Sequence, residues 1–287
     1  MEEMAFEVKN VSKRYERDAW ALKNVSLSLP EGCVMGLVGE NGAGKTTLIR
    51  LLLGTLARSE GDIRVLGGAP EDTRVRAQIG LVLGENFLPA TLRAGDVGRV
   101  LAGVYGQWDK ARYAQLLRDF GIDPKKEISK LSRGMQMKLQ IATALSHGAR
   151  LLIFDEATSG LDPVVRDEVL MLLRVFLQDE HCSVLLSSHI TSDLDKIADY
   201  IAFIHQGEVL FSQRRDELLD TMGVARLGEQ ALGRLPRELI ARVQRNDYGA
   251  TVLLRDRRAA SEFGVTSERA SIEEIMLLTL RGEEMPL

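Results

Sequence analysis

The sequence predicts an α/β fold in which helices cover both faces of a mostly parallel sheet. Short apolar runs at 33–38, 151–154 and 183–186 alternate with segments whose apolar residues recur at helical spacing. Strands joined by helices run parallel and are buried on both faces, so their sequences are continuously apolar. A second observation is a glycine-rich loop between the run at 33–38 and a helical segment at 48–53, because phosphate-binding α/β proteins have this strand–loop–helix order.

Composition narrows the class of protein. The 287 residues allow one large domain with a small appendage, and 45% hydrophobic with 27% charged residues is ordinary for a globular protein. A net charge of −4 gives no basic face, so no nucleic acid is expected as a partner. Cys33 and Cys182 each lie in an apolar stretch, which favours buried thiols in a reducing cytosol.

Two negative features of the sequence bear on membranes. It has no run of eighteen apolar residues that could span a bilayer. Residues 1–4, Met-Glu-Glu-Met, lack the basic and apolar regions of a signal peptide. We therefore expect any membrane role to come through a partner.

The remaining elements of the first domain follow in order. Residues 5–30 alternate apolar and polar side chains, which predicts an antiparallel sheet at the edge of the domain. Between about 86 and 148 the apolar residues fall at helical spacing, which predicts a helical insertion. A helix is expected from Pro163 to about Leu177, with proline in its first turn, and a hairpin over 201–211.

The pattern changes after residue 216. Residues 239–255 indicate a hairpin that turns at 246–249, and residues 271–281 indicate an amphipathic helix. We therefore predict a nucleotide-binding domain over 1–216 and a small α+β accessory domain over 217–287.

The glycine-rich loop predicts the ligand. Its sequence matches the P-loop pattern, in which glycines let successive backbone N–H groups point at phosphate oxygens, and the following helix adds the positive end of its dipole. Lys45 is expected to reach the β- and γ-phosphates, and the Thr46 hydroxyl to ligate Mg²⁺. The loop residues assigned to the nucleotide are Gly39, Asn41, Gly42, Ala43, Gly44, Lys45, Thr46 and Thr47.

Three further residues are expected at the same sheet edge. Asp155 ends the apolar run at 151–154, where it can hold Mg²⁺ through water, and Glu156 follows where an attacking water would meet the γ-phosphate. The alternative is that both carboxylates only cap the next turn. His189 ends the next apolar strand, at the edge where ligands of open α/β sheets collect.

A second candidate anion site precedes the helix that begins near residue 135. Ser132 and Gly134 lie at its N-terminus, where backbone N–H groups bind anions. One domain needs only one P-loop, so a second phosphate-binding turn is explained if it serves the nucleotide of another copy.

The order of these motifs resembles that of the ATP-binding subunit of ABC transporters, over about residues 5–215. The resemblance implies ATP and Mg²⁺ as ligands, with Lys45, Glu156 and His189 in the catalytic step and Thr46 and Asp155 at the metal. It also implies a cycle in which two protomers close head to tail over two nucleotides.

Besides His189, the resemblance assigns four residues outside the P-loop and the two carboxylates. Tyr15 is similar to the aromatic residue that stacks on adenine, although it could be a surface aromatic. Ser132 and Gly134 are similar to the signature turn that grips the γ-phosphate of the partner protomer, and Asp162 lies at the D-loop position.

Two departures from the family pattern bear on this assignment. The signature is usually Leu-Ser-Gly-Gly-Gln, and this chain has Arg133 and Met135 at its third and fifth positions. The glutamine expected in the Q-loop aligns with Gly84, which has no side chain to ligate Mg²⁺. Glu85 is next and is a candidate substitute, unless it is a solvated loop residue.

The segments at 104–109, 131–138 and 188–194 are similar to those of ABC-2-type exporters, in particular the YtrB-like and phenol-soluble-modulin (Pmt-type) peptide exporters. That branch implies a separate polytopic transmembrane subunit, a second nucleotide-binding subunit and a place at the cytoplasmic face of the membrane. Two alternatives stay open: a soluble ABC ATPase acting on nucleic acid or ribosomes, and a regulatory or immunity ATPase that moves no substrate.

Overall fold

The protein divides into two compact units, which we call the core unit (Met1–Ser212) and the C-terminal unit (Gln213–Leu287). The computed structural model describes residues 3–16, 19–247 and 249–283. Residues 1–2 and Tyr248, which entered the sequence analysis, lie outside the described residues. Within those residues, no helix combines the length and apolar character needed to cross a membrane.

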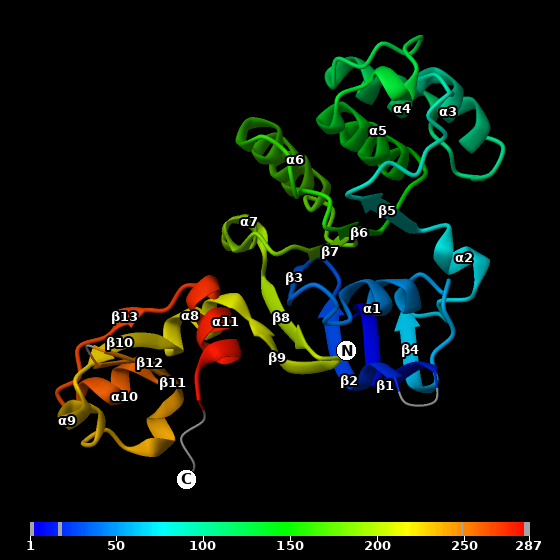
Figure 1. The fold of residues 1–287 in the computed structure, drawn as a ribbon. Helices are drawn as coiled ribbons and strands as arrows, with labels where there is room; N and C mark the ends of the chain where they lie inside the picture. The colour runs from blue at the N-terminus through cyan, green and yellow to red at the C-terminus, as the bar shows by residue number, and fades with distance from the viewer. Residues whose placement is uncertain (1–2, 17–18, 248, 284–287) are drawn as a thin grey trace. The chain divides into compact units, whose positions relative to one another are not determined.

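A six-stranded sheet forms the centre of the core unit, in the order β5-β6-β7-β3-β8-β9 (Figure 1). The pairs from β5 to β8 are parallel, and β3, β6 and β7 are almost entirely buried, as their apolar runs predict. The strands are β3 (Val34–Val38), β5 (Ile79–Leu83), β6 (Leu151–Asp155), β7 (Ser183–Ser187), β8 (Tyr200–His205) and β9 (Glu208–Arg214).

A three-stranded antiparallel sheet, β2-β1-β4, lies over helix α1 (Lys45–Leu52). Its strands are β1 (Met4–Glu16), β2 (Ala19–Pro30) and β4 (Glu60–Val65). Side chains of the alternating pattern, such as Phe6 and Leu29, share one buried core with Leu48 of α1 and Ile153 of β6. The predicted α/β class is confirmed, and this antiparallel sheet covers part of one face of the central sheet through α1.

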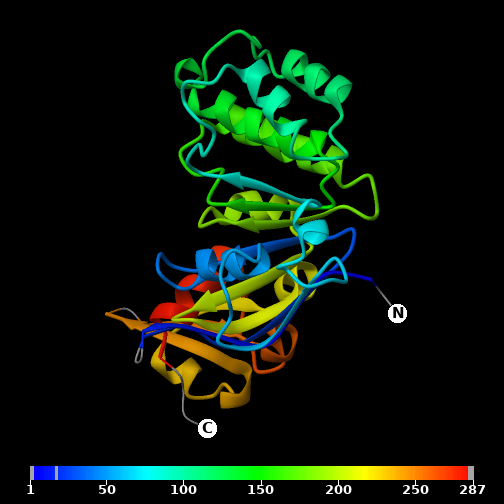
Figure 2. The same cartoon turned by 90° about the vertical axis from the view of Figure 1, so that its right-hand side faces the viewer.

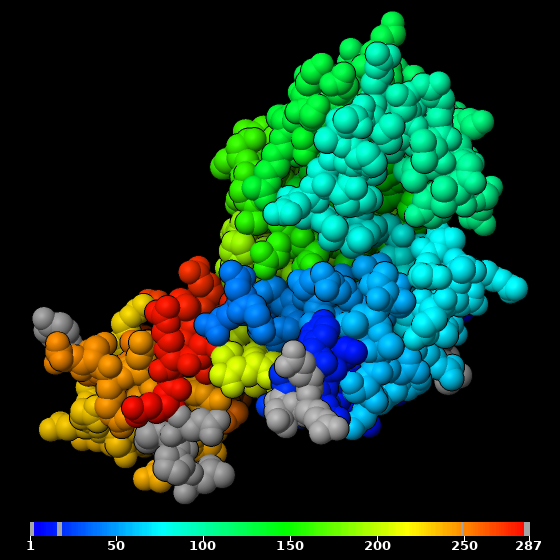
Figure 3. Space-filling view, turned by 45° about the vertical axis from the view of Figure 1, so that its right-hand side comes forward, coloured from blue at the N-terminus to red at the C-terminus, as the bar shows by residue number. Residues whose placement is uncertain are grey.

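The segment between β5 and β6 is helical and forms a lobe with a core of its own (Figures 2 and 3). Its elements are α3 (Ala94–Leu101), α4 (Lys110–Asp119), a 3₁₀ turn (Ile128–Lys130) and α5 (Arg133–Ser146). Val97, Leu117 and Leu139 are among the buried residues that join these elements. We call this segment the helical lobe.

The other helices of the core unit connect the strands. They are α2 (Thr73–Arg76), α6 (Pro163–Phe176) and α7 (Thr191–Ile197). Asp162 accepts hydrogen bonds from the first N–H groups of α6 and Pro163 occupies its first turn, so this helix begins where the sequence predicts.

The C-terminal unit contains an antiparallel sheet in the order β11-β12-β10-β13. Its strands are β10 (Gly223–Leu227), β11 (Ile240–Asn246), β12 (Gly249–Leu254) and β13 (Glu268–Arg269), and its helices are α8 (Arg215–Thr221), α9 (Glu229–Leu232), α10 (Arg257–Ser261) and α11 (Ile272–Arg281), with a 3₁₀ turn (Arg237–Leu239). A capping box between Ser271 and Glu274 starts α11, and Ile275 and Leu278 are buried.

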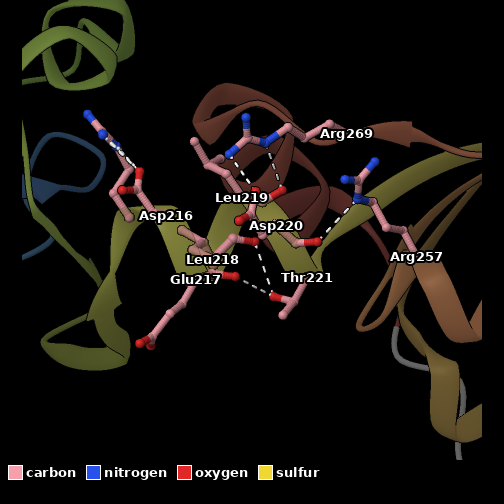
Figure 4. A network of polar contacts seen from close by, with 9 residues as sticks. Asp216, Glu217, Leu218, Leu219, Asp220, Thr221, Arg257 and Arg269 are labelled. Atoms are coloured by element: carbon pink, nitrogen blue, oxygen red, sulfur yellow. Dashed lines mark hydrogen bonds and ion pairs between the residues drawn. The ribbon is translucent and has the colours of Figure 1, made fainter.

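Helix α8 spans the predicted domain boundary at 216/217, and the division by contacts falls earlier, after Ser212. The reason lies at the end of this helix (Figure 4). Arg269 donates to the carbonyl of Leu219 and pairs with the carboxylate of Asp220, while Arg257 donates to the carbonyl of Asp220. Cations therefore satisfy the last carbonyls of α8 and bind it to the C-terminal unit.

Candidate functional site

The P-loop curls tightly between β3 and α1. Gly44 has a φ of +114°, and a Cβ at Gly39 would lie 2.3 Å from the carbonyl oxygen of Ile204, so glycine is required at both positions. Lys45 is only 4% exposed, and its Nζ donates to the carbonyls of Gly39 at 2.7 Å and Glu40 at 3.0 Å. The Lys45 side chain therefore packs against the backbone of its own P-loop.

Thr46 joins the P-loop to the end of strand β6. Its hydroxyl donates to Oδ2 of Asp155 over 3.0 Å. The other carboxylate oxygen, Oδ1, is buried and has no hydrogen-bond partner in the described part of the chain. A hydroxyl and a carboxylate with a free buried oxygen are hard oxygen donors of the kind that Mg²⁺ prefers, so these residues fit a magnesium ion.

Glu156 lies between the lysine and the histidine. Its Oε1 is 3.5 Å from Nζ of Lys45, and its Oε2 is 4.0 Å from Nδ1 of His189. The residue has a left-handed φ of +50°, and its N–H donates to the carbonyl of Ser187 at the end of β7. Two neighbouring parallel strands thus hold this carboxylate at their common edge.

Tyr15 lies beside the loop at the end of β1. Its hydroxyl is 3.4 Å from the Oγ1 of Thr47, and the ammonium of Lys13 lies 5.5 Å from its ring centroid. The residue is 53% exposed, so part of the ring is open to a planar ligand.

Ser132, Gly134 and Asp162 form a second group. Ser132 caps α5 and accepts from the N–H of Met135 at 3.3 Å, and Asp162 caps α6. A Cβ at Gly134 would lie 2.8 Å from a methyl group of Val165, so α5 and α6 approach closely here. In the residues that the structure describes, no hydrogen bond or ion pair joins this group to Gly39–Thr47.

Gly84, at the Q-loop position, packs directly against the backbone of Asp155 and Glu156. Gly84 donates its N–H to the carbonyl of Asp155 at 3.1 Å, and a Cβ at Gly84 would lie 2.8 Å from the carbonyl oxygen of Glu156. Glu85 is exposed, and it makes no hydrogen bond or ion pair with any described residue. The geometry gives no support to Glu85 as a metal ligand.

The sequence analysis missed Gln140, which connects the helical lobe to the sheet. This side chain is 2% exposed; its Oε1 accepts from the N–H of Leu83 at 2.9 Å and its Nε2 donates to the carbonyl of Leu83 at 3.3 Å. A polar residue among the apolar positions of α5 was the only available signal.

It also missed Arg166 of α6 and Asp193 of α7. The Nε of Arg166 is 3.8 Å from Oδ2 of Asp193, and its Nη2 donates to the carbonyl of Leu161 beside the D-loop aspartate. Burial raises the pKa of Asp193, and the positive charge of Arg166 opposes this rise. One guanidinium thus joins α6 to α7, the helix that follows His189.

These contacts define a class of protein: a P-loop nucleotide-binding domain in which a lysine, a hydroxyl and two carboxylates meet at the carboxyl edge of a parallel sheet. The family model described as "ABC transporter" matches residues 22–159. The lantibiotic transport ATP-binding protein SrtF of Streptococcus pyogenes is 32% identical over 211 residues, which cover 73% of this chain and 90% of that protein.

Other relatives agree. The bacitracin transport ATP-binding protein BcrA of Bacillus licheniformis is 32% identical over 194 residues, covering 66% of this chain and 63% of that protein. A solved ATP-binding subunit of an ABC transporter superposes with a TM-score of 0.68 at 27% identity, covering 75% of this chain and 91% of that one. The chain belongs to the ABC transporter family, as an ATP-binding and ATP-hydrolysing subunit.

Proposed function

We propose that this chain powers the export of peptides by closing head to tail with a second copy, or a related chain, over two Mg·ATP. The observation that carries the ATPase part is the meeting of Lys45, Thr46, Asp155 and Glu156 at one sheet edge. In this family ATP is generally bound with Mg²⁺, and the subunit works with membrane partner subunits.

The nucleotide is assigned to the P-loop side of this site. Tyr15 stacks on adenine, and backbone N–H groups of Gly39–Thr47 surround the phosphates with Lys45 at the β- and γ-phosphates. Thr46 and Asp155 hold Mg²⁺, which when bound supplies positive charge to the phosphates. On binding, the Lys45 ammonium exchanges its contact with the Glu156 carboxylate for contacts with the phosphates.

Hydrolysis is assigned to Glu156 and His189. Glu156 accepts a proton from, or orients, the attacking water, and its distance of 4.0 Å from His189 Nδ1 lets the imidazole steady the carboxylate. Loss of the γ-phosphate then removes the ligand that two protomers share.

The second protomer explains the separate group at α5 and α6. Ser132 and Gly134 lie at the start of a 14-residue helix, and no hydrogen bond or ion pair of the described residues joins them to the P-loop of their own chain. We assign them, with Asp162, to the nucleotide of the partner protomer. Each nucleotide then favours the closed pair, because only that state completes its contacts.

The peptide part of the proposal is supported by relatives that are lantibiotic and bacitracin transport ATP-binding proteins. The proposed partner is a separate polytopic membrane subunit that contacts residues 84–110, and the chain would lie at the cytoplasmic face of the membrane. The second candidate is an ATPase that regulates a membrane protein without moving substrate, since both would use the same ATPase site.

Purification of the intact chain from gently solubilised native membranes tests the proposal. A polytopic membrane protein in stoichiometric amount is expected, and vesicles containing both should move a peptide only with Mg·ATP. Recovery with ribosomes or nucleic acid alone would overturn the transporter assignment. ATP-dependent binding of the membrane protein without peptide movement would favour the regulatory candidate.

A further inference from the structure

The two departures from the family pattern touch each other. Nη2 of Arg133 donates to the carbonyl of Gly84 at 3.3 Å, which joins the signature turn to the Q-loop position. The same guanidinium rests on the D-loop, because a Cβ at Gly160 would lie 2.5 Å from Nη1 of Arg133. One side chain therefore contacts two loops that lie far apart in the sequence.

Both glycines make room for this arrangement. Gly160 has a φ of +72° and lacks the Cβ that would displace the guanidinium. Gly84 lies so close to the backbone of Glu156 that its Cβ would be 2.8 Å from that carbonyl oxygen. Arg133 thus reaches, through the backbone of one residue, the strand end that carries the catalytic carboxylate.

Arginine suits this place for a physical reason. Its guanidinium is flat, so one face can cover a glycine while an edge donates to a carbonyl, and lysine offers only a compact ammonium. Glycine, the usual residue at this position of the signature, can make neither contact. A glutamine at position 84 could make the lost Q-loop contacts only after the backbone moved.

We propose that Arg133 is a positioning residue that couples the signature turn to Glu156, in place of the missing Q-loop side chain. The inference rests on the proposed function, because it needs Ser132 to engage the partner's nucleotide. When Ser132 is engaged, the adjacent Arg133 holds Gly84 and Gly160 and so fixes the backbone around Glu156. Binding of ATP to the P-loop of the same chain does not involve Arg133.

A double-mutant cycle in the full chain tests this contact. We expect Arg133→Ala to lower kcat about tenfold or more, since small misplacements of catalytic groups are costly, and to leave KM and the nucleotide Kd within about twofold. Gly160→Ala should lower kcat as well, because its methyl group displaces the guanidinium and because alanine is strained at the φ of +72° that Gly160 adopts. The double variant should be no worse than Gly160→Ala alone, because the two changes remove one contact.

Two further variants sharpen the test. Arg133→Lys should restore part of kcat, because an ammonium can donate to Gly84 but cannot cover Gly160. Arg118→Ala, an exposed arginine on the same helical lobe that pairs with Gln115, is the matched control and should leave kcat unchanged. An unchanged nucleotide Kd also shows that each variant is folded.

The outcomes separate the two hypotheses. If the wild-type chain has no Mg·ATP hydrolysis that depends on Glu156, the proposed function fails. If wild-type hydrolysis is present and Arg133→Ala has the same kcat, or if the two substitutions are simply additive, only the coupling role of Arg133 fails.

Discussion

Nζ of Lys45 lies 3.5 Å from Oε1 of Glu156, so the lysine of the P-loop and the candidate catalytic carboxylate form an ion pair. The Glu156 side chain is 36% exposed and Lys45 is 4% exposed, so water screens one partner more than the other. Under the proposed function, a phosphate group would take the place of the carboxylate at the lysine, and Glu156 would then be free to act on water.

The first prediction concerns Glu156, the acidic partner in this ion pair. Glu156→Gln should lower ATP hydrolysis by about 10²–10⁴-fold, because a positioned base is lost. ATP should bind at least as tightly, because the amide competes less with phosphate for Lys45. Steady-state hydrolysis and calorimetric titration with Mg·ATP measure both. Glu208→Gln, which removes an exposed carboxylate near Lys23, is the control; equal hydrolysis in both variants would reject the role of Glu156.

Lys45→Ala should act on binding. The variant removes the cation expected at the β- and γ-phosphates, and charged hydrogen bonds of this kind are worth enough to weaken the Kd for ATP roughly 10- to 100-fold. The exposed Lys23→Ala should bind as the wild type does. An unchanged Kd for Lys45→Ala would exclude a phosphate contact by this side chain.

Tyr15 should strengthen binding of the adenine base and should not affect binding of the phosphates. Stacking of a base on an aromatic ring is worth about 1–3 kcal/mol, so Tyr15→Ala should weaken ATP binding roughly tenfold or more, and Tyr15→Phe should retain it. Inorganic triphosphate should bind equally to all three proteins. A loss of triphosphate binding in Tyr15→Ala would indicate damage to the P-loop through Thr47.

Gln140 should stabilise the join between the helical lobe and the sheet. Gln140→Leu keeps the size of the side chain and leaves the N–H and carbonyl of Leu83 without their partner, so the free energy of unfolding should fall by about 1–3 kcal/mol. Denaturation in urea measures this. Gln115→Leu, on the exposed side of α4, should change it by less than about 0.5 kcal/mol.

His147 should make stability depend on pH. It is 5% exposed and stacks on Tyr105 with centroids 4.3 Å apart, and burial lowers the pKa of its imidazole. The unfolded chain therefore binds a proton below about pH 6.5 that the folded chain resists, so the free energy of unfolding falls as pH falls from that value.

The variant His147→Phe should lack this contribution while keeping an aromatic ring at the stack. The wild type should lose stability as pH falls from 7.5 to 5 and the variant should lack this loss, so the free energy of unfolding of the wild type minus that of the variant should decrease over this range. Tyr105→Phe retains the histidine and should show the wild-type slope. Parallel curves for wild type and His147→Phe would contradict the assignment.

The parts of the site that lie within one strand–loop–helix unit could be predicted from the sequence. Gly39–Thr47 and the strand ending at Asp155 carry local patterns, and parallel strands must bring their carboxyl ends to one edge. The meeting of Thr46 with Asp155 follows from that topology. The alternation in β1 and β2 predicted their buried face for the same local reason.

The remaining contacts depend on how the helical lobe packs. Nothing near Gln140 in the sequence points to Leu83, and nothing near Arg133 points to Gly84 or Gly160, because these pairs meet only after α5 docks. From the sequence, Gly84 could be interpreted only as the loss of the Q-loop glutamine. In the structure a Cβ at this position would collide with the backbone of Glu156, which explains why glycine occupies it.

The two hydrogen bonds between Gln140 and Leu83 limit how helix α5 can move. Two hydrogen bonds from one planar amide to one residue resist sliding of α5 along β5, because a shift by a residue breaks both, but they permit a small tilt. Helix α5 is then a lever pivoted at Gln140, and Ser132 at its tip lies about 12 Å away at 1.5 Å per residue. A tilt of about 10° would carry the signature turn roughly 2 Å, while the pivot at Leu83, which pairs with Asp155 of β6, stays in place.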